Sequence, residues 1–367
     1  MAAPAGCIVA GMRHRTTWLA VSLIVAAVPA VAHAQPGPKP PMPPNLFSTT
    51  KLNDHLYVIA PSGPDMSNVG GNIGVCISDQ GVLLVDANYF LDWRNGQAVP
   101  MAQSVVDEVR KITTQPIRWV INTHHHGDHA GGDPVLAKIA PIISHRNARD
   151  RLLSGYQSAA KNAPAAVARA QQELVAAQAA KDNARIAQAQ DQLGRAQMNA
   201  KMVELTDANR ALPAITYDTE LTFQLGSEEI HLYHFGRAHT DGDTLVYFKT
   251  SNVIHWGDTF SNRWIPAMDA SGNSLDWIEW LDQGLAVSPS ATMVPGHGAI
   301  GTQADVLKLR VFFTKLQSDV RQEIAAGRTR EQAMDNVKDA EYVNYPGGAA
   351  RLRTNVGIIY DQLKSAR

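Results

Sequence analysis

The sequence contains a dense group of metal-binding side chains at residues 124–129, where His-His-His-Gly-Asp-His follows an apolar run that is typical of a buried strand. In an extended segment, residues two apart project to the same side, so His124 and His126 are expected to bind one cation together. Asp128 and His129 come where the chain turns into a helix, and we expect them to face a neighbouring cation. Imidazole nitrogen and carboxylate oxygen are usual donors to zinc. The alternative is a polar loop of surface histidines without a metal.

Three further candidate ligands lie in the second half of the chain, at His239, Asp258 and His297. Each follows an apolar, strand-like run and is flanked by Gly or Pro, which are typical of turns at strand ends. A catalytic zinc site needs a third protein ligand and keeps one position open for water or substrate. We therefore expect these side chains to complete the metal site that begins with residues 124–129.

These motifs, together with Asp86 at the end of the apolar run 82–85, resemble the motifs of the metallo-β-lactamase superfamily in type and order. The resemblance covers roughly residues 56–298. It implies an α/β fold of the four-layer αββα sandwich type, with two sheets face to face, helices outside, and the metal loops of both halves at one edge. Periodicity alone indicates only that helices and strands alternate.

The resemblance also implies a set of metal ligands. Carried over position by position, it assigns seven side chains to two Zn²⁺ ions: His124, His126 and His239 to the first, Asp128, His129 and His297 to the second, and Asp258 between them. Asp86 is expected to accept a hydrogen bond from the ligand loop and hold it in place; a simple turn residue is the alternative. Two cations about 3.5–4 Å apart lower the pKa of a bound water and polarise a carbonyl or phosphoryl oxygen. The implied activity is hydrolysis by a metal-bound hydroxide, with Asp128 and Asp258 as catalytic carboxylates.

The residue type at position 258 bears on the substrate. The β-lactamases proper tend to have Cys or Ser at the matching place, whereas Asp258 resembles the glyoxalase II, lactonase, alkylsulfatase and phosphodiesterase branches. We therefore expect cleavage of an ester, lactone, lactam or thioester bond in a small molecule. The nearest match to the basic substrate-binding residue of some lactamases is Arg263. Trp264, Tyr89 and Phe90 are candidates for the pocket wall, and core packing is the alternative for each.

Other functions are compatible with the same ligand pattern. The first alternative is a β-lactamase that hydrolyses antibiotics, which an exported protein would meet outside the cytoplasm. The second is a non-hydrolytic member of the same fold that binds iron. The third is a metal-storing or metal-binding protein without turnover. Metal content separates the iron alternative from the zinc hydrolase, and turnover on a substrate panel separates the storage protein.

Residues 1–34 are predicted to form a cleavable signal peptide, in which Arg13 and Arg15 precede the apolar run 18–31 and Ala32-His33-Ala34 gives the cleavage pattern. The mature chain would then be periplasmic or secreted, without stable membrane insertion. A membrane anchor is the alternative, but the apolar run is short for a spanning helix. Translation starts at Met1 or at Met12, and the sequence leaves that choice open.

The mature chain is expected to contain a Pro-rich linker at residues 35–50 and one domain at 51–367. Within that domain, a helix is predicted over residues 97–111. A helical insertion is predicted at about 156–210, where Ala, Gln, Lys and Arg predominate. The insertion is either one long helix or a hairpin that turns near Asp182. It is a candidate for a cap over the metal cleft or for a homo-oligomer contact, and a solvated excursion without a role is the alternative.

Composition excludes some partners. The chain has 33 Lys and Arg against 34 Asp and Glu, so no basic excess supports nucleic-acid binding. Cys7 belongs to the predicted signal peptide, which leaves Cys76 without an intramolecular disulfide partner, and its apolar neighbours indicate a buried position. His145 is interpreted as structural, and His125 is expected to alternate away from the metal. A small-molecule substrate is the partner that the sequence predicts.

Overall fold

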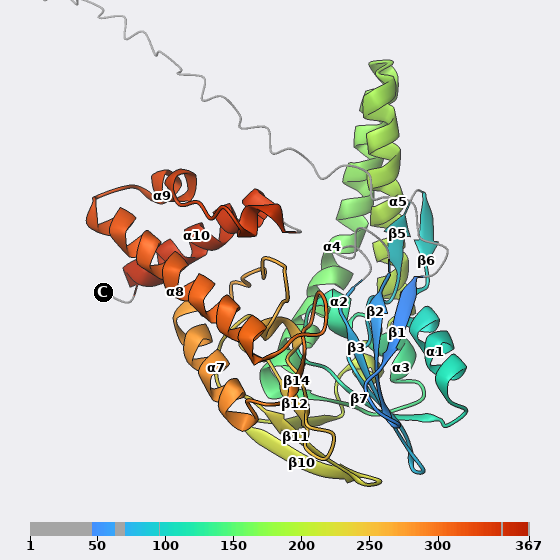
Figure 1. The fold of residues 1–367 in the computed structure, drawn as a ribbon. Coiled ribbons are helices and arrows are strands. Elements are labelled where there is room, and N and C mark those ends of the chain that lie inside the picture. The colour runs from blue at the N-terminus through green and yellow to red at the C-terminus, as the bar shows by residue number, and fades with distance from the viewer. Residues whose placement is uncertain (1–45, 63–69, 95, 346–347, 366–367) are drawn as a thin grey trace, which may run out of the picture. The chain divides into compact units, whose positions relative to one another are not determined.

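The computed structural model describes residues 46–62, 70–94, 96–345 and 348–365. The predicted signal peptide and most of the predicted linker lie outside the described residues. Two main sheets and a set of helices form the described part of the chain (Figure 1). None of the helices within these four ranges has the length and apolar character needed to cross a bilayer.

The first sheet contains seven strands in the order β1-β2-β3-β4-β7-β8-β9. Their bounds are β1 (Phe47–Lys51), β2 (Leu56–Pro61), β3 (Ile73–Ser78), β4 (Gly81–Val85), β7 (Ile117–Ile121), β8 (Ile142–His145) and β9 (Ile215–Tyr217). The first four strands form an antiparallel meander, and β4, β7, β8 and β9 run parallel. The carboxyl ends of β4 and β7 therefore lie side by side, which brings the residues after both strands to one edge of the sheet.

The second sheet contains five strands in the order β10-β11-β12-β13-β14. Their bounds are β10 (Glu220–Leu225), β11 (Glu228–Tyr233), β12 (Leu245–Phe248), β13 (Val253–His255) and β14 (Thr292–Val294). The sheet is antiparallel except for the last pair, in which β13 and β14 run parallel. The loops after β13 and β14 consequently start from the same edge of this sheet.

The two sheets pack face to face because alternate residues of their strands are apolar. In β4, Leu83 and Val85 belong to the apolar cluster shared with Leu232 and Val246 of the second sheet. Leu84, on the opposite face of β4, packs with residues of helix α1 (Met101–Ile112) instead. A strand that is buried on both faces reads as a continuous apolar run, and β4 has that sequence.

Helices cover the outer face of each sheet. Helices α1 and α3 (Asp133–Leu136) contribute to the core on the outer side of the first sheet. Helices α7 (Ser274–Val287), α8 (Gln303–Ala325) and α10 (Gly348–Ser365) pack over the second sheet around buried Trp277, Trp280 and Phe313. The short helix α9 (Arg330–Asn336) contacts α8 and α10. The predicted four-layer αββα architecture is confirmed.

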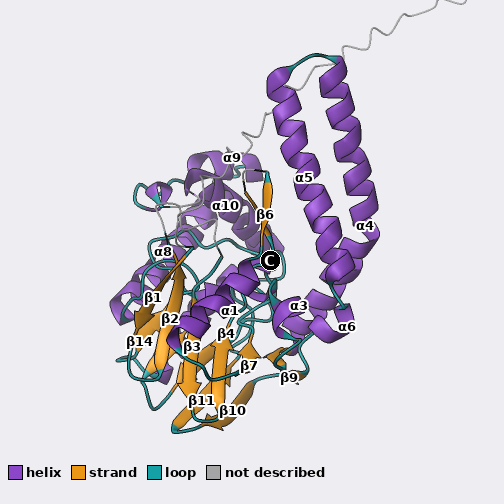
Figure 2. Ribbon diagram, turned by 90° about the vertical axis from the view of Figure 1, so that its right-hand side faces the viewer, coloured by secondary structure: helices purple, strands orange, loops and turns teal. Residues whose placement is uncertain are grey.

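The predicted insertion forms a hairpin of two long helices, α4 (Arg146–Ala179) and α5 (Asn183–Leu205), which lie side by side (Figure 2). Leu174, Ala177 and Ala189 pack between them. The turn follows from Lys181, which adopts a left-handed φ of 55°, and from Asp182, whose side chain accepts a hydrogen bond from the backbone N–H of Arg185. Helix α4 begins at Arg146, before the predicted start of the insertion, and helix α6 (Ala208–Ala211) follows the hairpin.

Two further boundaries differ from the sequence-based predictions. Strand β1 includes Phe47, so the interval predicted as linker extends too far toward the C-terminus. The helix predicted over residues 97–111 starts at Met101, because Pro100 cannot continue a strand ladder and favours a helix start after it. The residues before Pro100 instead form β6 (Gln97–Val99), which pairs with β5 (Asp92–Arg94) in a small hairpin.

Candidate metal centre

The loop that carries the first candidate ligands, residues 124–129, begins shortly after β7 and is braced by Asp86, the residue after β4. Asp86 is fully buried, and its Oδ1 accepts a hydrogen bond from the backbone N–H of Thr123 at 2.7 Å. Its Oδ2 accepts from Thr123 Oγ1 at 2.9 Å and from His129 Nδ1 at 2.7 Å. Asp86 has a φ of 72°, a left-handed conformation that an L-residue adopts only at a cost. Asp86 therefore contacts both the residue before His124 and the ring of His129.

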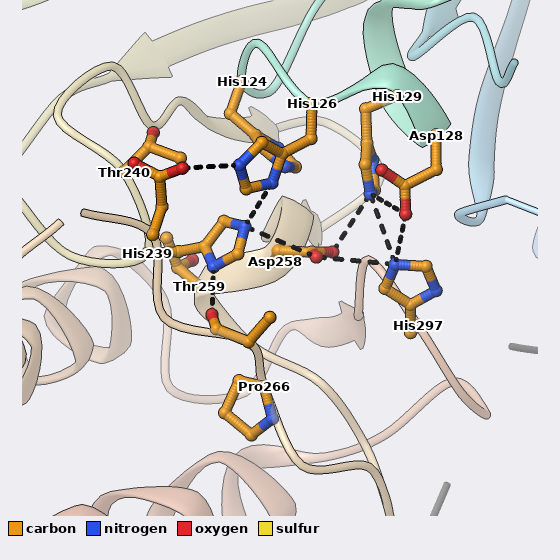
Figure 3. Close-up of polar contacts among 12 residues, drawn as sticks. His124, His126, Asp128, His129, His239, Thr240, Asp258, Thr259, Pro266 and His297 are labelled. Carbon is orange, nitrogen blue, oxygen red and sulfur yellow. Dashed lines mark hydrogen bonds and ion pairs between the residues drawn. The ribbon is translucent and has the colours of Figure 1, made fainter. Parts of the chain in front are cut away.

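The first cluster consists of His124, His126 and His239, whose nearest nitrogens all lie within 4.8 Å of one another (Figure 3). His239 Nε2 lies 2.9 Å from His126 Nδ1. The three ring centroids are 4.7–4.8 Å apart in edge-to-face arrangements. His124 Nε2 is buried and has no hydrogen-bond partner among the described residues. An orphaned acceptor of this kind fits a cation, because a buried polar atom without a partner is costly.

The tautomers of His124 and His239, which are set by their hydrogen bonds, also favour a cation at this cluster. Thr123 gives its single hydroxyl proton to Asp86, so its oxygen accepts from His124 Nδ1–H at 3.0 Å, which leaves His124 Nε2 unprotonated. His239 Nδ1–H donates to the Ala267 carbonyl at 2.7 Å, which leaves His239 Nε2 unprotonated. Bare nitrogens that converge on one point require a shared proton or a metal cation between them.

The second cluster consists of Asp128, His129 and His297, again with one donor atom each within 4.8 Å of the others. His297 Nε2 lies 3.3 Å from Asp128 Oδ2 and 3.4 Å from His129 Nε2. Asp128 and His129 belong to helix α2 (Gly127–Ala130), and His297 follows β14. The cluster therefore joins the two halves of the sandwich at one edge.

Asp258 lies between the two clusters (Figure 3). Its carboxylate oxygens are 3.2 Å from His129 Nε2, 3.4 Å from His297 Nε2 and 3.6 Å from His239 Nε2. The residue lies in a short 3-10 helix, Gly257–Thr259, that follows β13. Gly296 allows this position, because a Cβ there would come within 2.0 Å of Asp258 Oδ1. All seven side chains that the sequence singled out are thus brought together.

The electrostatics of the two clusters differ. Burial and the neighbouring His126 together lower the pKa of His239 to about 3. Burial and the adjacent imidazoles likewise hold the pKa of His124 well below its usual value. Burial also opposes charge on His297, but Asp258 and Asp128 outweigh it and raise the pKa of His297 to about 9. The pKa of Asp258 is well below its usual value despite burial, because His297 and His129 lie beside it.

Two contacts of the first cluster involve a segment that the sequence did not point to. His126 Nε2 donates to Asp269 Oδ2 at 3.0 Å, and His239 is held by Ala267. Both belong to the loop between the short 3-10 helix and α7. No motif marks Asp269, because its sequence neighbourhood has neither the strand-end pattern nor the His spacing that exposed the other residues.

The remaining predicted residues take different places. Trp264 is buried and stacks on His297, with 5.0 Å between ring centroids and 14° between planes. Arg263 is exposed and adopts a left-handed φ of 54°. The Tyr89 phenol has a raised pKa because of burial and because Asp128 lies near it. His125 belongs to neither cluster, and the His145 side chain caps α4 by accepting from the Asn147 N–H.

Comparison with known proteins identifies the class of this protein. The sequence profile of the metallo-beta-lactamase superfamily matches residues 68–297, which is more than half of the chain and includes all seven clustered residues. The chain belongs to this superfamily. With the His and Asp clusters, membership supports a metal-dependent hydrolase.

Solved structures of low sequence identity are similar to this chain. A metallo-beta-lactamase from Pontibacter korlensis is 15% identical, with a TM-score of 0.49 over 73% of this chain and 99% of that one. The DIM-1 metallo-beta-lactamase is 14% identical, with a TM-score of 0.48 over 73% of this chain and 97% of that one. The metallo-beta-lactamase IND-7 is 17% identical, with a TM-score of 0.48 over 73% and 98%.

Proposed function

We propose that this chain is an exported dinuclear zinc hydrolase that cleaves an ester, lactone, lactam or thioester bond in a small molecule. The observation that carries the proposal is the position of Asp258, whose carboxylate is shared between a three-imidazole cluster and an Asp-His-His cluster. A single carboxylate between two sets of donors is suited to a pair of cations. His124, His126 and His239 would hold one ion, and Asp128, His129 and His297 the other.

The donor types favour zinc. Five of the seven donors are imidazole nitrogens, which suit zinc, whereas calcium and magnesium prefer sites made of oxygen ligands. The second cluster has two imidazoles and one carboxylate, a set that also occurs in non-haem iron sites. That observation supports the iron alternative as a second candidate. Metal analysis of the purified protein separates the two.

When bound, the two cations supply Lewis acidity and a water molecule of lowered pKa. The side chains of the chain supply orientation and proton transfer. Asp128 is the proposed proton acceptor, since its side chain is 24% exposed, compared with 10% for Asp258 and 0% for Asp86. A carboxylate in contact with solvent can pass a proton on, whereas the more buried Asp258 is suited to holding charge between the clusters. Trp264 covers one face of His297 and keeps water from that side.

The proposed location and partners follow from the sequence. The predicted signal peptide at residues 1–34 would deliver the chain to the periplasm or the exterior, where its substrate is a small molecule. The α4–α5 hairpin is proposed as a homo-oligomer contact. A balanced charge is consistent with a partner other than nucleic acid.

Metal content and turnover test the proposal together. The purified protein is expected to bind two zinc ions per chain and to hydrolyse at least one of nitrocefin, a lactone, a thioester, an alkyl sulfate and an aryl phosphodiester. A chelator should abolish the activity, and zinc should restore it. His126→Ala and Asp258→Ala should be inactive, while His231→Ala, on β11 and outside the clusters, serves as the matched control. Full activity in either of the first two variants, or iron in place of zinc, would contradict the proposal.

A further inference from the structure

We propose that Asp269 is a positioning residue of the first metal site, which fixes the ring of His126 so that Nδ1 faces the cation. The inference rests on the proposed metal centre, although not on any particular substrate. The supporting observation is that the two ring nitrogens of His126 contact two different residues. His126 Nε2 lies 3.0 Å from Asp269 Oδ2, and His126 Nδ1 lies 2.9 Å from His239 Nε2.

These two contacts give the nitrogens of His126 separate tasks. A carboxylate only accepts hydrogen bonds, so its partner Nε2 carries the proton and Nδ1 keeps its lone pair. His124 and His239 present Nε2 to the same point, which makes His126 the member of the cluster that turns the other nitrogen inward. Without Asp269, nothing in these contacts distinguishes the two orientations of the His126 ring.

The braces of the neighbouring imidazoles show what is particular about Asp269. His124 is held by the Thr123 hydroxyl, and His239 by the Ala267 carbonyl, both of which are neutral. His126 is held by a carboxylate, as His129 is held by Asp86 in the second cluster. Each cluster therefore contains one carboxylate–histidine pair, an arrangement that orients a ligating imidazole and increases its basicity.

The loop that carries Asp269 is itself fixed. Asp269 Oδ1 accepts from the Ser271 N–H at 2.6 Å, and the Asp269 N–H donates to the His239 carbonyl at 3.3 Å. The buried Asn355 on α10 donates to the Pro266 carbonyl at 2.9 Å and accepts from the Met268 N–H at 3.3 Å. The C-terminal helix thus holds the segment that braces two of the three imidazoles of the first cluster.

A different reading treats Asp269 as a metal ligand. His125, His126 and Asp269 also place one donor atom each within 4.8 Å of one another. In that arrangement His126 Nε2 would bind a third cation instead of donating to Asp269. The pairing of Asp86 with His129 favours the brace, and the number of bound ions decides between the two.

The test measures zinc affinity in Asp269→Asn, Asp269→Ala and Asp269→Glu variants of the full chain by competition with a chelator. The Ala variant is expected to lose about 10–100-fold in affinity for one of two ions, the usual effect of losing such a partner. The Asn variant keeps an acceptor oxygen, so its zinc affinity should fall less than that of the Ala variant. The Glu variant keeps the carboxylate and should also bind zinc more tightly than the Ala variant. Asp276→Asn, an exposed carboxylate that contacts Asn273, is the matched control and should bind zinc as the wild type does.

Two additional measurements separate positioning from folding. The Asp269 side chain is 26% exposed, and Asn keeps an oxygen that can accept from the Ser271 N–H, so the thermal midpoint of metal-free Asp269→Asn should match that of the wild type. The visible spectrum of the Co²⁺-substituted Ala variant should change, because the ligand field of one ion changes. The inference would be overturned if the Ala variant kept the zinc affinity and the Co²⁺ spectrum of the wild type, or if the wild type bound a third zinc ion. It would also be overturned if metal-free Asp269→Asn unfolded at a lower temperature than the metal-free wild type. A wild type that binds no zinc would instead contradict the proposed function.

Discussion

The two clusters of the candidate centre lie side by side but differ in how they hold protons. In the first cluster, burial among imidazoles lowers the pKa of His124 and of His239, so these rings are neutral and have bare nitrogens. In the second cluster, the carboxylates of Asp258 and Asp128 outweigh burial and raise the pKa of His297 to about 9. The same residue type therefore has bare nitrogens ready for a cation at His124 and His239, whereas His297 and His129 favour a proton that a cation would have to displace.

The largest effect is expected from the residue that both clusters share. Asp258→Asn keeps the shape of the side chain but removes the charge that offsets His129 and His297. Hydrolysis should fall by more than about 100-fold, beyond the usual effect of losing an outer partner of a ligand. The second ion should be lost more readily than the first. Steady-state kinetics with parallel metal analysis checks this, and wild-type turnover with two bound ions would refute the shared role.

Asp86→Asn should weaken both clusters together. Asp86 binds His129 directly and reaches His124 through Thr123, so an amide in its place disturbs the tautomers on both sides. We expect about 10–100-fold lower zinc affinity at each site, and a metal-free protein less stable by about 1–3 kcal/mol because the buried partners lose an acceptor. Chelator competition and urea unfolding measure the two effects. Lower zinc affinity at only one cluster would show that the hydrogen bonds through Thr123 do not connect Asp86 to the first cluster.

The pH dependence of zinc binding should separate the clusters. A cation at the second cluster must displace protons from His297 and from His129, whose pKa values are both raised, so affinity there should rise by at least tenfold per pH unit up to a pH of about 9. Affinity at the first cluster should change less steeply. In the metal-free protein, the raised pKa of His297 gives stability that is present below pH 6.5 and lost as the pH rises through about 9. If zinc affinity depended on pH equally at the two clusters, the proposed difference in their protonation would be wrong.

The smallest effect is expected from His125→Ala. His125 is a neighbour of His124 and His126 in the sequence but belongs to neither of the two clusters that Asp258 joins. Its removal should leave two zinc ions bound with affinities unchanged, as measured by chelator competition. A lost ion in this variant would place His125 among the ligands and would break the division into two clusters.

The sequence predicted the parts of the centre that local patterns encode. Strand β7 and the loop after it are recognisable because an apolar run ends in a cluster of metal-binding side chains, and His239, Asp258 and His297 each follow a similar run. The sandwich could be predicted because the order of these motifs resembles that of one family. Local chemistry and motif order therefore suffice for side chains that lie at strand ends.

Other features depend on contacts between distant segments, which no local pattern reports. Asp269 faces His126 across 143 positions of sequence, and Asn355 holds the loop that carries it from a helix 89 positions beyond Pro266. Helix α4 starts at Arg146, before the insertion that the sequence predicts, because the composition changes only later in the chain. Most of strand β1 falls in the predicted linker, because its pairing with β2 is visible only in the folded sheet.

Anomalous X-ray diffraction at the zinc absorption edge, on crystals grown with zinc, tests the central claim most directly. The account predicts two zinc peaks per chain, one beside His124, His126 and His239 and the other beside Asp128, His129 and His297, with Asp258 between them. A single peak, or zinc bound only elsewhere on the chain, would contradict it.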